Sequence, residues 1–289
     1  MVALKPYLQL TRPANLLTAL ADILAGLAIA GFTFSGEPYV YLLLATLGLY
    51  GGGVVLNDVF DAELDAVERP ERPIPSGKVS LRSATIFGGV LLALGIMSAR
   101  FFSLTSGLVA LGIAVLVLLY DRNAKHSKLW GPIVMGMCRG GNLLLGISVL
   151  PAALSDYSWV GIIPIIYIGA ITMISQDEVH GGKQRTLYLA GSLYALVHLV
   201  QLFVAHTQGN FLIAIPFVGL HLFMVARPLW AAIQNPVGPL IGKAVKAGVL
   251  SLIVMDAAWC VAFGQWPLAL VVLLLLPFSI YLAKIFAVT

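Results

Sequence analysis

Residues 39–65 read YVYLLLATLGLYGGGVVLNDVFDAELD, an apolar run that ends in a series of acidic residues. The apolar part, residues 39–56, is long enough to cross a hydrocarbon core about 30 Å thick as a helix. In the polar part, residues 57–65, acidic side chains recur at the spacing of a helix. This stretch therefore predicts a membrane-spanning helix with an acidic end.

The rest of the chain has the same apolar character. Of its 289 residues, 60% are hydrophobic and 10% are charged, whereas a soluble domain has roughly a quarter charged residues. We therefore expect an all-α, polytopic membrane helical bundle that forms a single domain over residues 1–289, and not a soluble protein, a transmembrane barrel or a lone signal peptide. The predicted spans are residues 14–34, 39–56, 81–99, 104–120, 130–151, 159–175, 187–205, 211–230, 244–263 and 266–286.

The basic residues predict which side of the membrane each loop occupies. If the N-terminus is cytoplasmic, all of the 17 Lys and Arg residues except Arg100 and Arg139 fall in or beside cytoplasmic segments. The positive-inside rule then places both termini in the cytoplasm. A basic cytoplasmic face accounts for the net charge of +4 without a nucleic-acid partner. Cys138 and Cys260 lie inside apolar stretches, which excludes a disulfide framework.

The longest cytoplasmic segment, residues 57–80, holds six of the 13 acidic residues. On a helix, Asn57, Asp61 and Asp65 project from one face, about 5 Å apart, and Asp58 precedes Asp61 by three residues. Like charges stacked in this way repel one another unless a cation neutralises them. One or two carboxylates completed by phosphate oxygens are typical of Mg²⁺ sites. The alternative is a solvated acidic helix end, offset by nearby basic residues.

Two arginines follow the acidic residues in the sequence ERPERPIPSGKVS, residues 68–80. The prolines and the glycine stop the helix and predict an ordered turn before the third span. Arg69 and Arg72 present planar donors that suit phosphate oxygens. The alternative is that these arginines, with Lys78 and Arg82, anchor the chain to the membrane surface.

These motifs resemble a known family. Residues 57–77, which read N-D-x-x-D-x-x-x-D and then R-P-I-P-S-G, are similar to the first signature of the UbiA superfamily of intramembrane prenyltransferases. Arg12, Pro13 and Asn15 resemble the beginning of that family, and Tyr120 and Lys125 resemble its Y-x-x-x-x-K element. The resemblance implies nine core helices around a cavity, with residues 266–286 as an extra, lipid-facing helix. It also implies a cytoplasmic active site.

The resemblance further implies a reaction and a set of site residues. Mg²⁺ and a prenyl diphosphate would bind at the Asp-rich segments, and a small acceptor, often an aromatic ring, would receive the prenyl group. Asp58, Asp61 and Asp65 would be the catalytic carboxylates, and with Asn57 they would hold the first metal ion. The residues expected to bind substrate are Asn15, Asn57, Arg69, Arg72, Tyr120, Lys125, Arg139, Asn142, Lys183 and Arg185.

The second Asp-rich signature departs from the family pattern. The corresponding stretch is ISQDEVHGGKQRT, residues 174–186, in which Asp177, Glu178 and His180 are the candidate ligands. We expect Asp177 and Glu178 to complete a single or altered metal site, in which Lys183 and Arg185 replace a metal as diphosphate partners. The run QDEVHGG is similar to a divergent branch, the EboC-like proteins.

The departure leaves a second function open. A protein of this fold without turnover would bind an isoprenoid or another metabolite, or carry it across the membrane. Ionisable residues within membrane spans usually face the interior of the bundle or a cavity. Asp22 is a candidate for lining the cavity, and Asp256 either faces the same interior or makes a structural contact. His198 and His221, which have no partner at ligand spacing, are interpreted as packing residues.

Overall fold

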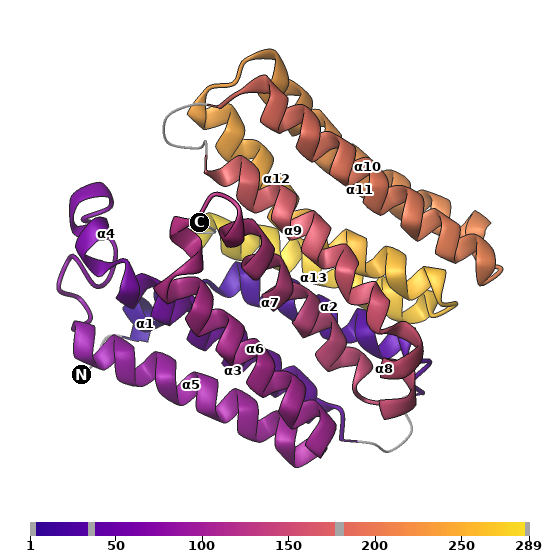
Figure 1. Ribbon diagram of the computed structural model, residues 1–289, viewed down its shortest axis with the longest axis horizontal. Helices are drawn as coiled ribbons and strands as arrows, with labels where there is room; N and C mark the ends of the chain where they lie inside the picture. The colour runs from indigo at the N-terminus through magenta and orange to yellow at the C-terminus, as the bar shows by residue number, and fades with distance from the viewer. Residues whose placement is uncertain (1–3, 34–37, 177–181, 287–289) are drawn as a thin grey trace.

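The computed structural model describes residues 4–33, 38–176 and 182–286, and the regular structure in these ranges is helical, with no strand. This confirms the all-α prediction (Figure 1). The helices are α1 Leu4–Leu10, α2 Pro13–Ile29, α3 Val40–Phe60, α4 Ala62–Glu68, α5 Leu81–Phe102, α6 Leu104–Arg122, α7 Trp130–Ile147, α8 Pro151–Tyr157, α9 Ile162–Ser175, α10 Gln184–Thr207, α11 Phe211–Gln234, α12 Gly238–Ala262 and α13 Trp266–Ile285.

Each of the ten predicted spans overlaps one long helix: α2, α3, α5, α6, α7 or one of α9 to α13. Within the described ranges, eight segments are long and apolar enough to cross a membrane, and α1 with α2, bent by 51°, would make nine. Helix α7 lies outside this set because Arg139 and Asn142 lower its hydropathy. Length and composition thus support a multi-pass membrane protein without singling out a core of nine helices.

The end of the fifth predicted span differs from the structure because a proline starts a new helix, whereas α5 and α6 begin at the predicted residues 81 and 104. The fifth predicted span runs on to Pro151, but α7 ends at Ile147, and Pro151 instead opens α8. Proline suits the first turn of a helix because the backbone N–H that it lacks has no intrahelical partner there. Helices α5 and α6 begin at serine caps, where the Ser80 and Ser103 hydroxyls each accept a backbone N–H.

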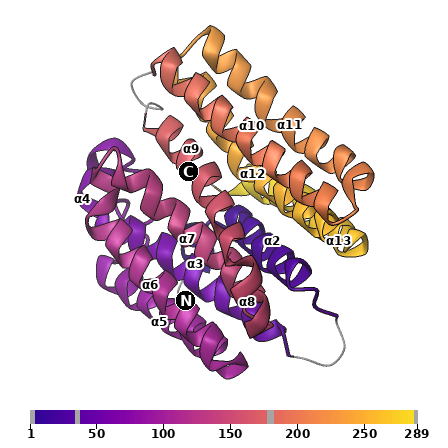
Figure 2. The same ribbon diagram turned by 45° about the vertical axis from the view of Figure 1, so that its right-hand side comes forward.

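The helices form two outer groups around a central set (Figures 1 and 2). Helices α3, α5 and α6 pack together on one side, and α10 and α11 on the other, while α2, α7, α9 and α12 lie between them. The crossing of α2 and α7 depends on two glycines. A Cβ atom at Gly26 would lie 2.6 Å from the Leu143 carbonyl oxygen, and one at Gly146 would lie 2.5 Å from the Ile23 carbonyl oxygen. The two backbones therefore touch.

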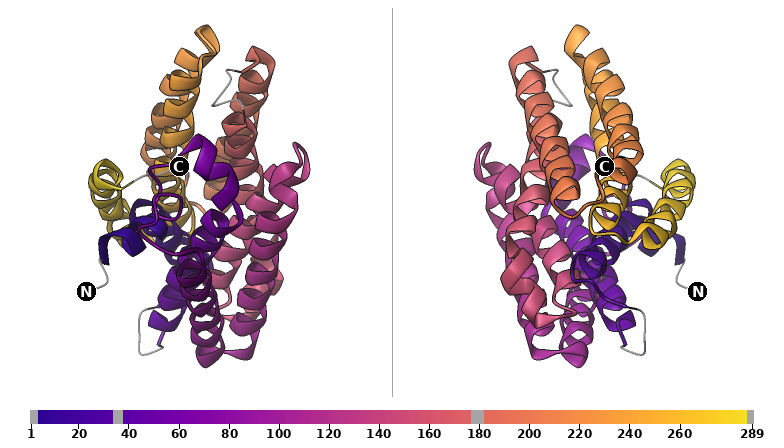
Figure 3. Two further views of the ribbon diagram at one scale, coloured as in Figure 1. Left: turned by 90° about the vertical axis from the view of Figure 1, so that its left-hand side faces the viewer. Right: turned by 90° about the vertical axis from the view of Figure 1, so that its right-hand side faces the viewer.

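The last helix, α13, lies at the edge of the bundle, beside α2 (Figure 3). Leu268, Ala269 and Val272 are buried, and the Ser279 hydroxyl donates a hydrogen bond of 2.9 Å to the Ala14 carbonyl oxygen. Much of the rest of its surface is exposed and apolar, including Leu274 and Phe278. The helix predicted to face lipid thus exposes apolar side chains on one side, and its other side packs on α2 and α12.

Candidate active site

A cavity of about 420 Å³ opens between the central helices and α3. Polar side chains from the end of α3, from α4 and from the segment after α4 line one part of it. The rest of the wall is largely apolar, and Arg139 and Asn142 of α7 interrupt it. The apolar lining residues are Leu49, Leu64, Ile113, Val117, Met135, Ile168, Ile171, Val245, Val249 and Leu252.

The acidic end of α3 keeps its helical spacing across a break. Helix α3 ends at Phe60 and α4 begins at Ala62, yet backbone hydrogen bonds still run from Asp61 to Asn57 and from Asp65 to Asp61. Asn57, Asp61 and Asp65 all line the cavity, as the predicted shared face requires. Asp58 is buried behind them and is absent from the described lining.

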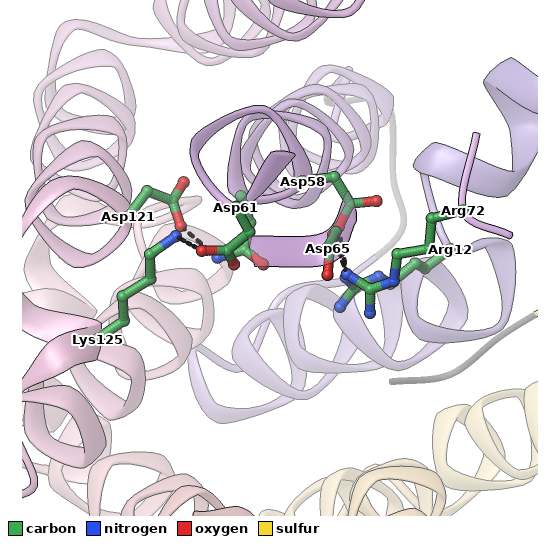
Figure 4. Close-up of polar contacts among 8 residues, drawn as sticks. Arg12, Asp58, Asp61, Asp65, Arg72, Asp121 and Lys125 are labelled. Carbon is green, nitrogen blue, oxygen red and sulfur yellow. Dashed lines mark hydrogen bonds and ion pairs between the residues drawn. The ribbon is translucent and has the colours of Figure 1, made fainter. Parts of the chain in front are cut away.

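Two arginines neutralise one pair of these aspartates (Figure 4). The Arg72 guanidinium lies 2.7 Å from an Asp65 oxygen and 3.4 Å from Oδ1 of Asp58. The Arg12 guanidinium lies 2.7 Å from the same Oδ1 of Asp58. Arg12 and Arg72 both line the cavity.

A second polar cluster lies on the opposite side of Asp61 (Figure 4). Lys125 Nζ lies 2.6 Å from an Asp61 oxygen. The Asn57 amide donates a hydrogen bond of 2.9 Å to the carboxylate of Asp121, which is buried at the end of α6. Asp121 directly follows Tyr120, another lining residue. This cluster holds Asn57 against the end of α6 and Asp61 against the segment that follows it.

A third polar cluster joins α2 to α7 deeper in the bundle. Arg139 Nε lies 2.6 Å from an Asp22 oxygen, and Arg139 also donates a hydrogen bond to the Thr18 carbonyl oxygen. The Asn142 amide donates to the same Asp22 oxygen at 2.8 Å and accepts a hydrogen bond from Thr46 at 2.7 Å. Arg139 and Asn142 line the cavity, whereas Asp22 is fully buried.

The structure brings together most of the residues predicted to bind substrate, because Asn15, Asn57, Arg69, Arg72, Tyr120, Arg139 and Asn142 all line the cavity. Lys125 is absent from the described lining, but its amine contacts Asp61, which lines the cavity. Lys183 and Arg185 are exposed and do not belong to the described lining. The predicted metal ligands Asp177 and Glu178, with His180, lie outside the described residues.

The cavity offers carboxylates to a metal ion. Within residues 4–33, 38–176 and 182–286, no three His, Cys, Asp or Glu side chains converge as a metal site would require. Asp61 and Asp65, however, both line the cavity on one face, each beside a cation of the chain. Because Mg²⁺ often binds through one or two carboxylates with phosphate oxygens completing its shell, this pair fits an ion that arrives with a diphosphate.

Sequence reasoning missed several partners in these clusters. The sequence places Arg12 at the family beginning and among the cytoplasmic basic residues without indicating a partner, and it gives no role to Asp121, which adjoins Tyr120. His198 and His221, which sequence spacing left without partners, lie with ring centroids 4.7 Å apart, and His221 Nε2 is 3.1 Å from the Tyr167 hydroxyl. These histidines belong to a buried polar contact between α9, α10 and α11.

Comparison with known families agrees with the cavity and with the aspartates that line it. The sequence pattern of the UbiA prenyltransferase family matches residues 19–237, well over half of the 289 residues. The chain belongs to the UbiA prenyltransferase family. The family predicted from residues 57–77 is thereby confirmed.

Relatives and solved structures of the UbiA fold are consistent with this assignment. The digeranylgeranylglyceryl phosphate synthase of Methanococcoides burtonii is 36% identical over 159 residues, which are 52% of this chain and 57% of that protein. The chain thus spans little more than half the length of that relative. The apo structure of a UbiA homologue from Aeropyrum pernix aligns with a TM-score of 0.70 and 15% identity, over 84% of this chain and 96% of that chain. A UbiA homologue from Archaeoglobus fulgidus bound to DMAPP and Mg²⁺ aligns with a TM-score of 0.64 and 16% identity, over 85% of this chain and 98% of that chain.

Proposed function

We propose that this protein transfers a prenyl group from a prenyl diphosphate to an acceptor within the membrane, with Mg²⁺ as its cofactor. The observation that carries the proposal is the cavity itself. Its polar part holds aspartates beside arginines, and its wall is largely apolar. A prenyl diphosphate has the same two-part character, with an anionic head and a hydrocarbon tail.

The anionic head is assigned to the polar part of the cavity. Arg12, Arg69 and Arg72 line it, and guanidinium groups bind phosphate oxygens through paired hydrogen bonds. Lys125 adds a fourth cation beside Asp61. Asp61 and Asp65 are the carboxylates that we propose hold Mg²⁺, which supplies charge neutralisation on the leaving diphosphate when it is bound. The homologue from Archaeoglobus fulgidus, bound to DMAPP and Mg²⁺, supports this assignment.

The reaction then needs little from the protein beyond position and charge. The bond between C1 of the prenyl group and the diphosphate oxygen breaks, a bond from C1 to the acceptor forms, and the acceptor loses one proton. The cations of the chain stabilise the charge that develops on the leaving group. The apolar wall, including Val117, Met135 and Ile171, excludes water, which would otherwise capture the allylic cation.

The acceptor is proposed at the level of its class. The related digeranylgeranylglyceryl phosphate synthases carry a glyceryl phosphate product in their name, which favours a prenylated glyceryl phosphate acceptor over an aromatic ring. We also propose that the acidic end of α3 and both termini face the cytoplasm, because that arrangement keeps most of the basic residues on the cytoplasmic side.

The proposal is tested by binding measurements on the purified protein in nanodiscs. Dimethylallyl, geranyl and geranylgeranyl diphosphates are titrated with and without Mg²⁺, on wild type, Asp61→Asn and Glu63→Gln. Glu63 is the matched control because it is exposed and lies outside the described cavity lining. We expect Mg²⁺-dependent binding to wild type and to Glu63→Gln, weakened at least about tenfold by Asp61→Asn, as loss of a charged contact predicts.

Transfer to acceptors is then measured with a panel that contains geranylgeranylglyceryl phosphate and 4-hydroxybenzoate. If wild type forms a product and Asp61→Asn does not, the result supports the proposed prenyl transfer. Tight prenyl diphosphate binding without any transfer would instead support the non-catalytic binding or transport function. Absence of binding at every chain length would refute the proposal.

A further inference from the structure

Asp58 pairs with two arginines and is absent from the described cavity lining. Its Oδ1 atom is 2.7 Å from the Arg12 guanidinium and 3.4 Å from that of Arg72. The Asp58 side chain is 8% exposed, close to the 7% of Asp65, whereas that of Asp61 is 20% exposed. Asp61 lines the cavity, and Asp58 is absent from the described lining. Neighbouring aspartates of one motif therefore occupy different environments.

The two arginines come from separate parts of the chain. Arg12 lies in the turn between α1 and α2, 46 residues before Asp58, and Arg72 lies 14 residues after Asp58, in the segment that follows α4. Two guanidinium groups that converge on one place repel each other unless a carboxylate lies between them. Asp58 supplies that carboxylate for both, and Asp65 supplies a second one for Arg72.

The backbone at Arg12 shows a further constraint. Arg12 has a φ of 47°, and it is the one residue other than glycine with a positive φ in the described part of the chain. The left-handed conformation is unfavourable for a residue with a Cβ atom, so surrounding contacts must hold it. The hydrogen bond to Asp58 is such a contact, and it directs the guanidinium toward the cavity that Arg12 lines.

A carboxylate in this position is poorly suited to bind a metal ion. To coordinate one through Oδ1, Asp58 would have to release both arginines, which would leave two cations without their partner. Asp61 would have to release only Lys125, and Asp65 only Arg72. The flexible amine of Lys125 can turn toward a phosphate oxygen. The arginines, in contrast, can bind a diphosphate while Asp58 still holds them, because each guanidinium has five N–H donors.

We propose that Asp58 is a positioning residue, which holds the guanidinium groups of Arg12 and Arg72 at the cavity for a diphosphate and does not bind the metal. The inference rests on the proposed function, because it assigns the cavity to a prenyl diphosphate. Asp58 acts through the two arginines, so its removal weakens the binding of the diphosphate itself. Removal of a metal ligand weakens only the part of the binding that depends on Mg²⁺.

The test measures geranyl diphosphate and inorganic pyrophosphate binding to the protein in nanodiscs, first with EDTA and then over a series of Mg²⁺ concentrations. With EDTA, Asp58→Asn is expected to weaken binding at least about tenfold relative to wild type, whereas Asp61→Asn binds no more weakly than wild type. In the Mg²⁺ series, the concentration for half-maximal effect is expected to stay within about twofold of wild type for Asp58→Asn and to rise at least about tenfold for Asp61→Asn.

Asp58→Asn would overturn the inference if it bound normally with EDTA and required at least tenfold more Mg²⁺, because Asp58 would then behave as a metal ligand. If wild type binds neither probe under any condition, the proposed function itself is refuted. If wild type binds and Asp58→Asn behaves as a metal-ligand variant, only the role of Asp58 is refuted. Should Asp58→Asn not fold, Arg12→Gln keeps Asp58 in place. We expect Arg12→Gln to lose EDTA-resistant binding with an unchanged Mg²⁺ requirement, and the opposite result would also overturn the inference.

Discussion

Arg139 Nε lies 2.6 Å from Oδ2 of Asp22, and this ion pair joins α7 to α2 in the interior of the bundle. The Arg139 side chain is 6% exposed and that of Asp22 is 0% exposed, so both charges are largely buried. Asn142 donates a further hydrogen bond to the same Asp22 oxygen. The pair therefore keeps a guanidinium at the wall of the cavity without leaving its charge unbalanced in an apolar surrounding.

Asp22→Asn is expected to destabilise the protein because it leaves Arg139 buried without its counter-ion. Removal of one partner of a buried pair costs about 3–5 kcal/mol, while replacement of both partners by apolar residues is often neutral. The melting temperature in detergent should therefore fall for Asp22→Asn and recover in part for Asp22→Leu with Arg139→Met. Asp156→Asn, at an exposed position of α8, is the control and should melt like wild type. A double variant less stable than Asp22→Asn would contradict the pairing.

Gly146→Ala is expected to destabilise the crossing of α2 and α7. The new Cβ atom would lie 2.5 Å from the Ile23 carbonyl oxygen, so the helices would have to separate. Overpacking of this kind costs about 1–3 kcal/mol. Gly219→Ala in α11 is the matched control, since a Cβ atom there meets nothing within 4 Å. Thermal melting of the two variants should show a loss for Gly146→Ala and no loss for Gly219→Ala; equal losses would rule out the close crossing as the cause.

Lys125→Met is expected to weaken prenyl diphosphate binding about tenfold or more, because it removes a cation next to Asp61. Lys128→Met changes an exposed residue three positions later and tests the alternative that basic residues here only attract the membrane surface. Equilibrium titration of geranyl diphosphate in nanodiscs compares the two. If both variants weakened binding equally, membrane attraction would explain the basic residues better than a diphosphate site.

Removal of Mg²⁺ with EDTA is expected to abolish prenyl transfer and to leave the helical fold unchanged. The carboxylates proposed to hold the ion, Asp61 and Asp65, already have cationic partners in the chain, so the fold does not depend on the metal. Circular dichroism and product analysis, before and after Mg²⁺ is restored, provide the measurement. Transfer that continued in EDTA would refute the metal requirement, and loss of helicity would show that the ion also supports the fold.

Local patterns in the sequence predicted the helices and the acidic end of α3. Membrane helices follow from runs of apolar residues, and the shared face of Asn57, Asp61 and Asp65 follows from a spacing of four residues. Both depend on residues near one another in the chain. The Arg-Pro pairs predicted diphosphate contacts at Arg69 and Arg72, and both residues line the cavity. A resemblance to the family signature was enough to indicate the chemistry.

The sequence by itself thus determined the all-helical membrane fold, the family and the residues at the end of α3. Only the tertiary structure decided that Asp58 faces Arg12 and that Asp22 faces Arg139, because these partners come from different segments of the chain. Asn142 contacts Asp22 across a separation of 120 residues, a contact set by how closely α2 and α7 can approach at Gly26 and Gly146. Local spacing specifies which side chains share a helix face, whereas helix packing selects the partner that each face meets.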